Sequence, residues 1–329
     1  MNTSLTDFIE KLPKTENHLH IEGALPWELL CNANPQKYST PPASWKSDFR
    51  FRDFAHFESE LLGYAGDYFH SAQRYHDCAR AVFAQRMASN VHYMEVSFAS
   101  GCIDFMNLDG REVADAIRAA VPKGLEVRIF LGIHHSGWTE KMTPILNEAL
   151  GWQNLDGIDL HGSEDIPVDA AAPHYWEKAR DAGKFTKAHA GEFMGADFVR
   201  YAVEVLGAQR INHGVRAVED PSVLDLLRER AIALDVCPIS NVKLRVASSP
   251  ENHQIRELLA SGIACSVSTD DPISFGNTLT EEYQMLSDAI EFDRIQLIRV
   301  ARHGFEASLT TEEWKKIHFQ KLDHLARSL

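Results

Sequence analysis

The chain has 329 residues, of which 44% are hydrophobic, so it can bury the core of one large α/β barrel or of two ordinary domains. Its formal net charge of −14 disfavours nucleic acid and anionic membranes as partners, because both require clustered Lys and Arg side chains. A small neutral or cationic substrate fits this charge better.

The cysteines and the N-terminal residues indicate a reducing compartment. The cysteines are scattered and contain no C-x-x-C pair, which argues against a disulfide framework and against a thiolate zinc site. The first residues lack the basic start and the apolar run of a secretory signal. No apolar stretch reaches the roughly 18–20 residues of a membrane helix. We therefore expect a cytoplasmic protein that does not enter membranes.

Short apolar segments alternate with longer amphipathic segments along the chain. Eight segments have the composition of strands, at 15–21, 91–98, 125–133, 155–161, 185–190, 209–213, 232–238 and 263–269. Helix-like segments lie between them, at 108–121, 139–150, 174–182, 195–206, 220–230 and 251–261. Eight such units predict an α/β fold, a single (β/α)8 TIM-type barrel. A doubly wound open sheet is the competing fold, but no G-x-G-x-x-G follows the first strand.

Two regions do not fit the repeating unit of one strand followed by one helix. Residues 34–90 form a long insertion after the first strand, with two helix-like runs rich in aromatic side chains. We expect these runs to form either an outer layer with a packed aromatic face or a lid over the barrel mouth. Residues 278–329 are expected to form three helices that close the barrel. Because no repeat or flexible linker occurs, the sequence predicts one domain over residues 1–329.

Histidines and carboxylates gather at the predicted strand ends. His18 and His20 are separated by one residue, so they lie on the same face of the first strand. His189 ends the fifth strand, His213 ends the sixth, and Asp270 follows the eighth. Side chains at the C-terminal strand ends surround the active site of a barrel. Three imidazoles and a carboxylate are a suitable ligand set for zinc there.

Four motifs carry these residues. In chain order they are HLHIEGAL, KAHAGE, RINHGVRAVED and SVSTDDP, and the segments YMEV, GIDLHGSE and CPISN accompany them. Together they resemble the adenosine deaminase family of the amidohydrolase superfamily. The other zinc deaminases combine H-x-E with P-C-x-x-C, and the chain does not contain P-C-x-x-C, which argues against cytidine-deaminase-like and tRNA-editing activities.

The resemblance implies a metal-dependent hydrolase barrel that holds one Zn²⁺ per chain. The implied ligands are His18, His20, His189 and Asp270. The predicted fourth strand, LDGIDLHG, lacks the lysine that would bridge two metal ions, so a single ion is favoured.

The resemblance also implies roles around a purine ring. Glu192 would protonate N1, while His213 or Asp270 would take or orient the proton of the attacking water. Asp271 would bind N7, and the backbone N–H of Gly191 would bind N3.

The implied reaction is zinc-dependent hydrolytic deamination of a 6-aminopurine, adenosine to inosine or adenine to hypoxanthine, with release of ammonia. Glu22 stands where adenosine deaminases usually carry Asp, and its longer side chain shortens the pocket in favour of a free base. Another N6-bearing purine is a further candidate. Alternatives of other classes are a non-catalytic, metal-bound purine-binding barrel and an amidohydrolase acting on an amide or ester. The presence of Glu192, His213 and Asp271 argues against the first, and the second would leave Asp271 and Gly191 without a ring to recognise. The sequence indicates no oligomeric state.

Lys187 is a residue that the family pattern does not explain. It shares the strand parity of His189, so it is predicted to point into the barrel one layer below the site. A buried lysine requires a carboxylate partner, for which Glu95 and Asp159 are the candidates. Glu95, Asp159 and Glu164 are expected to pack around the site rather than to react.

Overall fold

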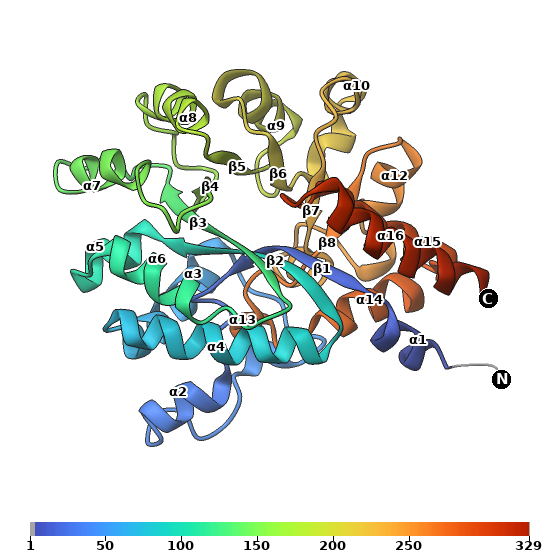
Figure 1. Ribbon diagram of the computed structural model, residues 1–329, viewed down its shortest axis with the longest axis horizontal. Coiled ribbons are helices and arrows are strands. Elements are labelled where there is room, and N and C mark those ends of the chain that lie inside the picture. The colour runs from blue at the N-terminus through green and yellow to red at the C-terminus, as the bar shows by residue number, and fades with distance from the viewer. Residues whose placement is uncertain (1–3, 329) are drawn as a thin grey trace.

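Eight parallel strands form one sheet that curls around a common axis (Figure 1). This computed structural model describes residues 4–328, so residues 1–3 and 329 of the predicted domain lie outside the described residues. The strands are β1 (Lys14–His20), β2 (Val91–Ala99), β3 (Glu126–His134), β4 (Gly157–His161), β5 (Phe185–Ala190), β6 (Arg210–His213), β7 (Leu234–Val236) and β8 (Cys265–Val267). Each strand pairs with the next in chain order, which confirms the predicted (β/α)8 barrel.

The seam between β1 and β8 is closed largely by side chains. Ser268 Oγ accepts the backbone N–H groups of Asn17 and His18 at 3.0 and 3.1 Å. Just beyond β8, Leu19 forms an isolated parallel bridge with Asp270. The last residues of β1 therefore lie directly beside the TDDP segment, although about 250 residues separate them in the chain.

Helices surround the strands and make the connections between them (Figure 1). After β2 to β8, they are α5 (Ser100–Met106), α6 (Gly110–Ala119), α7 (Met142–Ala149), α8 (Ala172–Asp181), α9 (Ala196–Tyr201), α10 (Pro221–Glu229), α11 (Pro238–Lys243), α12 (Ile255–Ala260) and α13 (Pro272–Phe275). The sequence prediction placed the main helices of this layer correctly. Between residues 4 and 328, no helix combines the length and the apolarity needed to cross a membrane.

The insertion divides into two helices with different positions. Helix α4 (Ala72–Ala88) packs on α6 and β2 and completes the outer layer. Helix α3 (Phe54–Tyr68) packs against α13 and α5 at the C-terminal end of the barrel. Both begin at a side-chain cap, since Asp53 accepts the N–H of His56 and Ser71 accepts the N–H of Arg74. The aromatic side chains of α3 pack inward, as the stacking of Phe57 on Phe275 shows.

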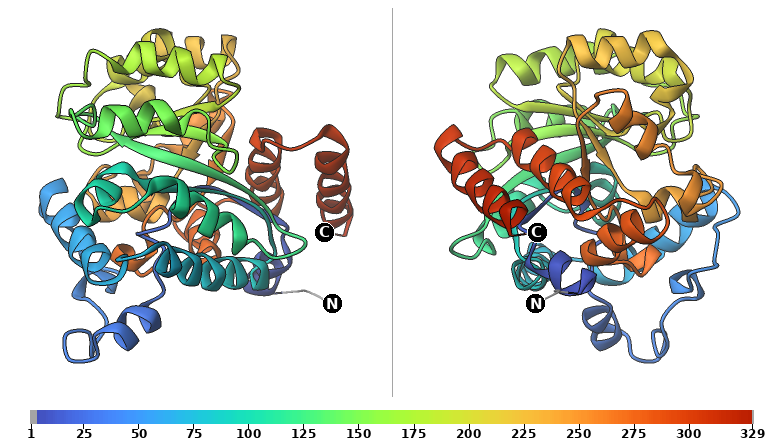
Figure 2. Two further views of the ribbon diagram at one scale, coloured as in Figure 1. Left: turned by 60° about the vertical axis from the view of Figure 1, so that its left-hand side comes forward. Right: turned by 90° about the vertical axis from the view of Figure 1, so that its right-hand side faces the viewer.

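The predicted C-terminal helices are α14 (Leu279–Asp288), α15 (Arg294–Ala307) and α16 (Glu312–Arg327). Helix α15 packs on β1 and β8, and Asn17 donates its side-chain N–H to the carbonyl of Gly304 at 3.1 Å. The backbone N–H of Leu309 donates to the Tyr93 hydroxyl at 2.9 Å, which ties the segment after α15 to β2. Figure 2 shows α15 and α16 together on one side of the barrel. The remaining α-helices of residues 4–328 are α1 (Leu5–Lys11) and α2 (Trp27–Ala33).

Lys187 points into the barrel, as predicted, and only 3% of its surface is exposed. Its Nζ lies 3.2 Å from Glu95 and 3.3 Å from Asp235, and Arg210 contacts the same two carboxylates. Glu95 is therefore confirmed as a partner. The other candidate was wrong, because Asp159 instead contacts two histidines at the barrel mouth.

We expect the Lys187→Met substitution to lower the free energy of unfolding by about 3–5 kcal/mol, because it leaves two buried carboxylates with only Arg210 as a cation. Urea denaturation followed by circular dichroism measures this change. Lys178→Met, the same substitution at an exposed position on α8, serves as the control. Equal stability of the two variants would contradict a structural role for Lys187.

Candidate active site

A cavity of about 420 Å³ opens at the C-terminal ends of the strands. One side is polar and is formed by His20, Glu22, Glu192, His213, Asp270 and Asp271. The other side is apolar and comes from α3 and α5, including Phe54, Phe57 and Met106. Its location agrees with the rule that barrel strands direct functional side chains to their C-terminal ends.

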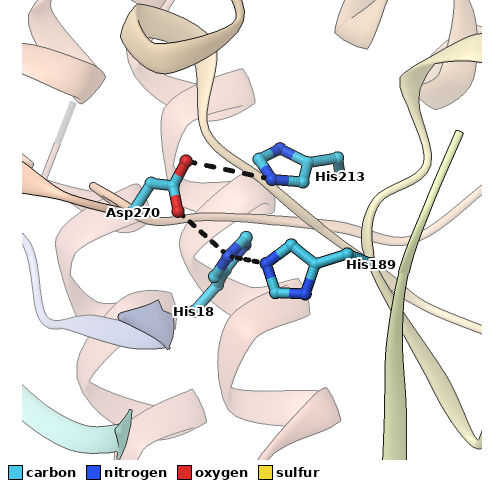
Figure 3. A group of neighbouring side chains, drawn as sticks. All are labelled: His18, His189, His213 and Asp270. Atoms are coloured by element: carbon cyan, nitrogen blue, oxygen red, sulfur yellow. Dashed lines mark hydrogen bonds and ion pairs between the residues drawn. The ribbon is translucent and has the colours of Figure 1, made fainter. Parts of the chain in front are cut away.

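Four predicted metal ligands converge at the floor of this cavity. The Nε2 atom of His18 lies 3.2 Å from that of His20 and 3.0 Å from that of His189. The Nε2 atoms of His20 and His189 are 3.2 Å apart. Oδ1 of Asp270 lies 3.3 Å from His18 and 3.1 Å from His20. Figure 3 shows His18 between His189 and Asp270.

These separations fit a divalent metal ion. Metal–ligand bonds of about 2.0–2.1 Å in a tetrahedral site place neighbouring ligand atoms about 3.3 Å apart. In five of the six pairs among the four candidate ligand atoms, the two atoms lie 3.0–3.3 Å apart. The donor set therefore fits an ion such as zinc in size and in chemistry.

The second nitrogen of each imidazole is held by a neighbour. Nδ1 of His18 lies 3.2 Å from the carbonyl of Asp235, and Nδ1 of His189 lies 2.9 Å from the carbonyl of Leu160. Nδ1 of His20 lies 3.1 Å from Oγ of Ser97. A carbonyl oxygen accepts a hydrogen bond from Nδ1–H, which leaves the Nε2 lone pairs of His18 and His189 free for a metal.

His213 lies beside these residues, and it forms with His18, His189 and Asp270 a group that could hold a metal ion. Its Nε2 is 3.8 Å from Oδ2 of Asp270, the carboxylate oxygen that faces away from His18 (Figure 3). Ser240 also donates to that oxygen, at 2.8 Å. His213 and Asp270 have φ angles of 63° and 66°, a left-handed conformation that is costly for residues other than glycine. The fold thus holds both side chains in positions that an ordinary strand ending would not give.

Glu192 lies beside His213, with Oε2 3.5 Å from the His213 Nε2 atom. The loop that carries it is held by Glu164, which accepts the backbone N–H groups of Glu192 and Phe193 at 3.1 and 2.8 Å. This confirms that Glu164 packs around the site. Gly191 precedes Glu192 with φ of 74°, and a Cβ atom there would lie 2.3 Å from Val199, so only glycine fits this turn.

Burial and neighbouring charges shift the pKa values of Glu192, Asp270 and His213 in different directions. Burial and the nearby Asp270 carboxylate raise the pKa of Glu192 well above its ordinary value, which favours its protonated form. Burial would also raise the pKa of Asp270, but the His18 and His20 imidazoles outweigh it and hold that pKa well below its usual range. Burial and His18 lower the pKa of His213, so its ring is neutral. Burial raises the pKa of Asp271 as well, so carboxyl groups that favour the acid form lie beside the Asp270 carboxylate, an arrangement suited to proton transfer.

The other predicted substrate contacts are placed as follows. Asp271 and Glu22 line the cavity, whereas Gly191 is not among the described residues that line it. Glu22 Oε1 accepts the Tyr75 hydroxyl at 2.8 Å and the Ala99 backbone N–H at 3.0 Å.

Sequence reasoning missed several residues of the site. His161 lines the cavity at the end of β4, with Nε2 3.2 Å from Asp159, and the strand-end rule could have identified it. Asn241 contacts both Glu192 and His213, but its CPISN motif carried no predicted role. Tyr75 has no sequence signal, because it reaches Glu22 from the outer helix α4.

The sequence profile of the adenosine deaminase family matches residues 13–325. The chain belongs to this family. It is 31% identical to an adenine deaminase of Chlorobium luteolum over 99% of this chain and 98% of that protein. Among solved structures, an adenine deaminase from Arthrobacter aurescens has a TM-score of 0.85 at 24% identity, covering 96% of this chain and 99% of its own. A zinc-bound amidohydrolase from Burkholderia ambifaria has a TM-score of 0.83 at 20% identity, covering 100% and 96%.

Membership in the adenosine deaminase family makes the protein a hydrolase acting on C–N bonds in cyclic amidines. The family is metal-dependent, and the cluster of histidines with Asp270 is the place in this deaminase that could bind the metal.

We expect Gly23→Ala to lower the kcat/KM of the deaminase by about 10²-fold, because a misplacement of about 1 Å at a reacting site costs this much. A methyl group at Gly23 would lie 1.7 Å from Oδ1 of Asp271 and 2.6 Å from its Cβ, so Asp271 must move. Gly63→Ala on α3, where nothing lies within 4 Å of the added methyl group, is the matched control. Steady-state kinetics of both variants check this, and equal activities would contradict it.

Proposed function

We propose that this chain hydrolyses adenine to hypoxanthine and ammonia, with one Zn²⁺ per chain. The observation that carries the proposal is the convergence of His18, His20, His189 and Asp270 next to Glu192, whose pKa is raised by burial. The similarity to relatives named adenine deaminase supports the same substrate.

The charge of the cavity supports a base or nucleoside rather than a nucleotide. None of the described residues that line the cavity is Lys or Arg. Five lining residues are acidic, namely Glu22, Glu58, Glu192, Asp270 and Asp271. A phosphate group would lack a cationic partner and would meet acidic side chains, which is unfavourable in a site of low dielectric constant.

The position of Glu22 supports the free base over the nucleoside. Two hydrogen bonds to Oε1 hold the carboxyl group in place, and only 4% of the residue is exposed. A free purine carries an imidazole N–H that the second carboxyl oxygen can accept. A nucleoside replaces this N–H with a sugar, for which the longer side chain of Glu22 leaves less space. Adenosine is thus the poorer substrate in this proposal.

The ligand geometry supports zinc, which His18, His20, His189 and Asp270 would hold. When bound, the ion supplies Lewis acidity, which lowers the pKa of a water molecule to about 7.

The side chains of the chain itself would bind and protonate the purine. Glu192, as the neutral acid, donates its proton to N1, so that C6 accepts the oxygen of water and later releases ammonia. Asp270 Oδ2 and His213 Nε2 would receive or orient the proton of that water. Asp271, which lines the cavity, would bind N7.

Helix α3 would act as the lid of the site. It supplies Phe54, Phe57, Glu58, Leu61 and Leu62 to the cavity wall, and Leu62 is 53% exposed although it lines the cavity. A base bound beneath this helix would be shielded from solvent.

Glu192→Gln is expected to lower kcat on adenine by about 10²–10⁴-fold, the usual contribution of a positioned general acid. Glu204→Gln, an exposed substitution, should have no effect. The assay follows ammonia release with adenine, adenosine and an N6-substituted adenine. Turnover of adenosine in preference to adenine would contradict the proposed substrate, and no turnover of any 6-aminopurine by the zinc-loaded protein would instead indicate a binding protein.

His189→Gln is expected to reduce the bound zinc well below one equivalent, because it removes one of four ligands. Metal content after dialysis, measured by inductively coupled plasma mass spectrometry, tests this. His174→Gln carries the same change on an exposed helix and should keep one equivalent. Retention of a full equivalent by His189→Gln would contradict this ligand assignment.

A further inference from the structure

A branched chain of four hydrogen bonds leads from a backbone N–H to the two proton-carrying side chains of the site. The backbone N–H of Ile255, at the start of α12, donates to Nδ1 of His253 at 3.1 Å. Nε2 of His253 lies 3.2 Å from Oδ1 of Asn241. Nδ2 of Asn241 lies 3.3 Å from Oε1 of Glu192 and 3.2 Å from Nδ1 of His213.

The donor of the first hydrogen bond is the backbone N–H of Ile255, and this determines which group donates in each of the following bonds. Imidazole tautomers and amide orientations are ordinarily ambiguous, and only the surrounding hydrogen bonds decide between them. A backbone N–H can only donate, so Nδ1 of His253 is an acceptor without a proton. The proton of a neutral His253 therefore lies on Nε2. Burial lowers the pKa of His253 to about 3, so this ring is neutral.

The tautomer of His253 determines the orientation of the Asn241 amide. Because Nε2–H of His253 requires an acceptor, Oδ1 of Asn241 must face it. The two N–H bonds of the Asn241 amide then point to Glu192 and His213. An N–H that donates to Nδ1 of His213 leaves that nitrogen without a proton, so a neutral His213 carries its proton on Nε2.

We propose that Asn241, oriented by His253, is a positioning residue that sets the proton on Nε2 of His213 and on Oε2 of Glu192. Since Oε1 of Glu192 accepts from Asn241, its acid proton lies on the other oxygen. A protonated Nε2 can donate to the attacking water but cannot accept from it. Of the two groups that flank the water in the proposed function, Asp270 therefore takes the proton and His213 orients the oxygen.

Asn241 and His253 act only through other residues. Neither lines the cavity among the described residues, and both are buried, at 0% and 3% exposure. Their contribution should therefore appear in kcat and leave KM little changed, unlike that of a residue in contact with the substrate.

The test is a long-range ¹H–¹⁵N correlation spectrum of the full chain, loaded with zinc and labelled in its histidine rings. The signals of the two histidines are assigned by their loss in His213→Gln and His253→Gln. We expect the Nε2–H tautomer for both rings of the wild-type protein. The Nδ1–H tautomer at His213, or a doubly protonated His253, would overturn the proposal. No variant needs to be active for this result.

Asn241→Asp provides the kinetic arm, since it keeps the size of the side chain but replaces both donors by acceptors. We expect it to shift His213 toward the Nδ1–H tautomer. We also expect kcat to fall about ten- to a hundredfold with KM little changed, a part of the about 10²–10⁴-fold that positioned acid–base groups contribute. Asn252→Asp, an exposed neighbour of His253, is the control. Wild-type tautomer and kcat in Asn241→Asp would overturn the proposal.

Only the kinetic arm rests on the proposed function. A wild-type protein that shows both expected tautomers but does not deaminate adenine would support the hydrogen-bond chain and contradict the proposed substrate. The two failures are therefore distinguishable.

Discussion

The closure of the barrel between β1 and β8 is the constraint on which the site depends. His18 and His20 are separated by one residue in the chain, but their partner Asp270 becomes available only when the Leu19–Asp270 bridge forms and Ser268 binds the end of β1. Three imidazole nitrogens and a carboxylate oxygen then lie within van der Waals distance of one another. Such crowding is favourable only when protons or a cation bind among these lone pairs, so the fold prepares a cation site through its own closure.

Beneath this site, the barrel is filled with balanced charge. Lys187 and Arg210 face Glu95 and Asp235, and the backbone carbonyl of Asp235 also holds His18. The positions of the buried charges and of His18 are thus coupled through β7. Buried ion pairs add little net stability, but removal of one member is costly, so this layer fixes geometry more than it adds free energy of folding.

The sequence predicted the parts of this molecule that depend on local pattern. Alternating segments gave the barrel, and strand parity placed His18, His20 and Lys187 correctly, because side chains in a strand have a fixed period. The residues that sequence analysis missed make their contacts with segments that are distant in the chain. Tyr75 meets Glu22 only because α4 packs outside β2, and Asp235 meets Lys187 only through the register of β7. Asn241 and His253 required the hydrogen bonds themselves, since a polar side chain in a loop has many possible partners.

The central claim is that residues from β1, β5 and the end of β8 enclose one divalent ion with nitrogen and oxygen ligands. X-ray absorption spectroscopy of the zinc-loaded protein measures that ligand set directly. The account predicts a single zinc environment with three imidazole nitrogens and at least one oxygen, at about 2.0–2.2 Å. Sulfur ligands, such as Cys237 beside His18, or fewer than three imidazoles would contradict it.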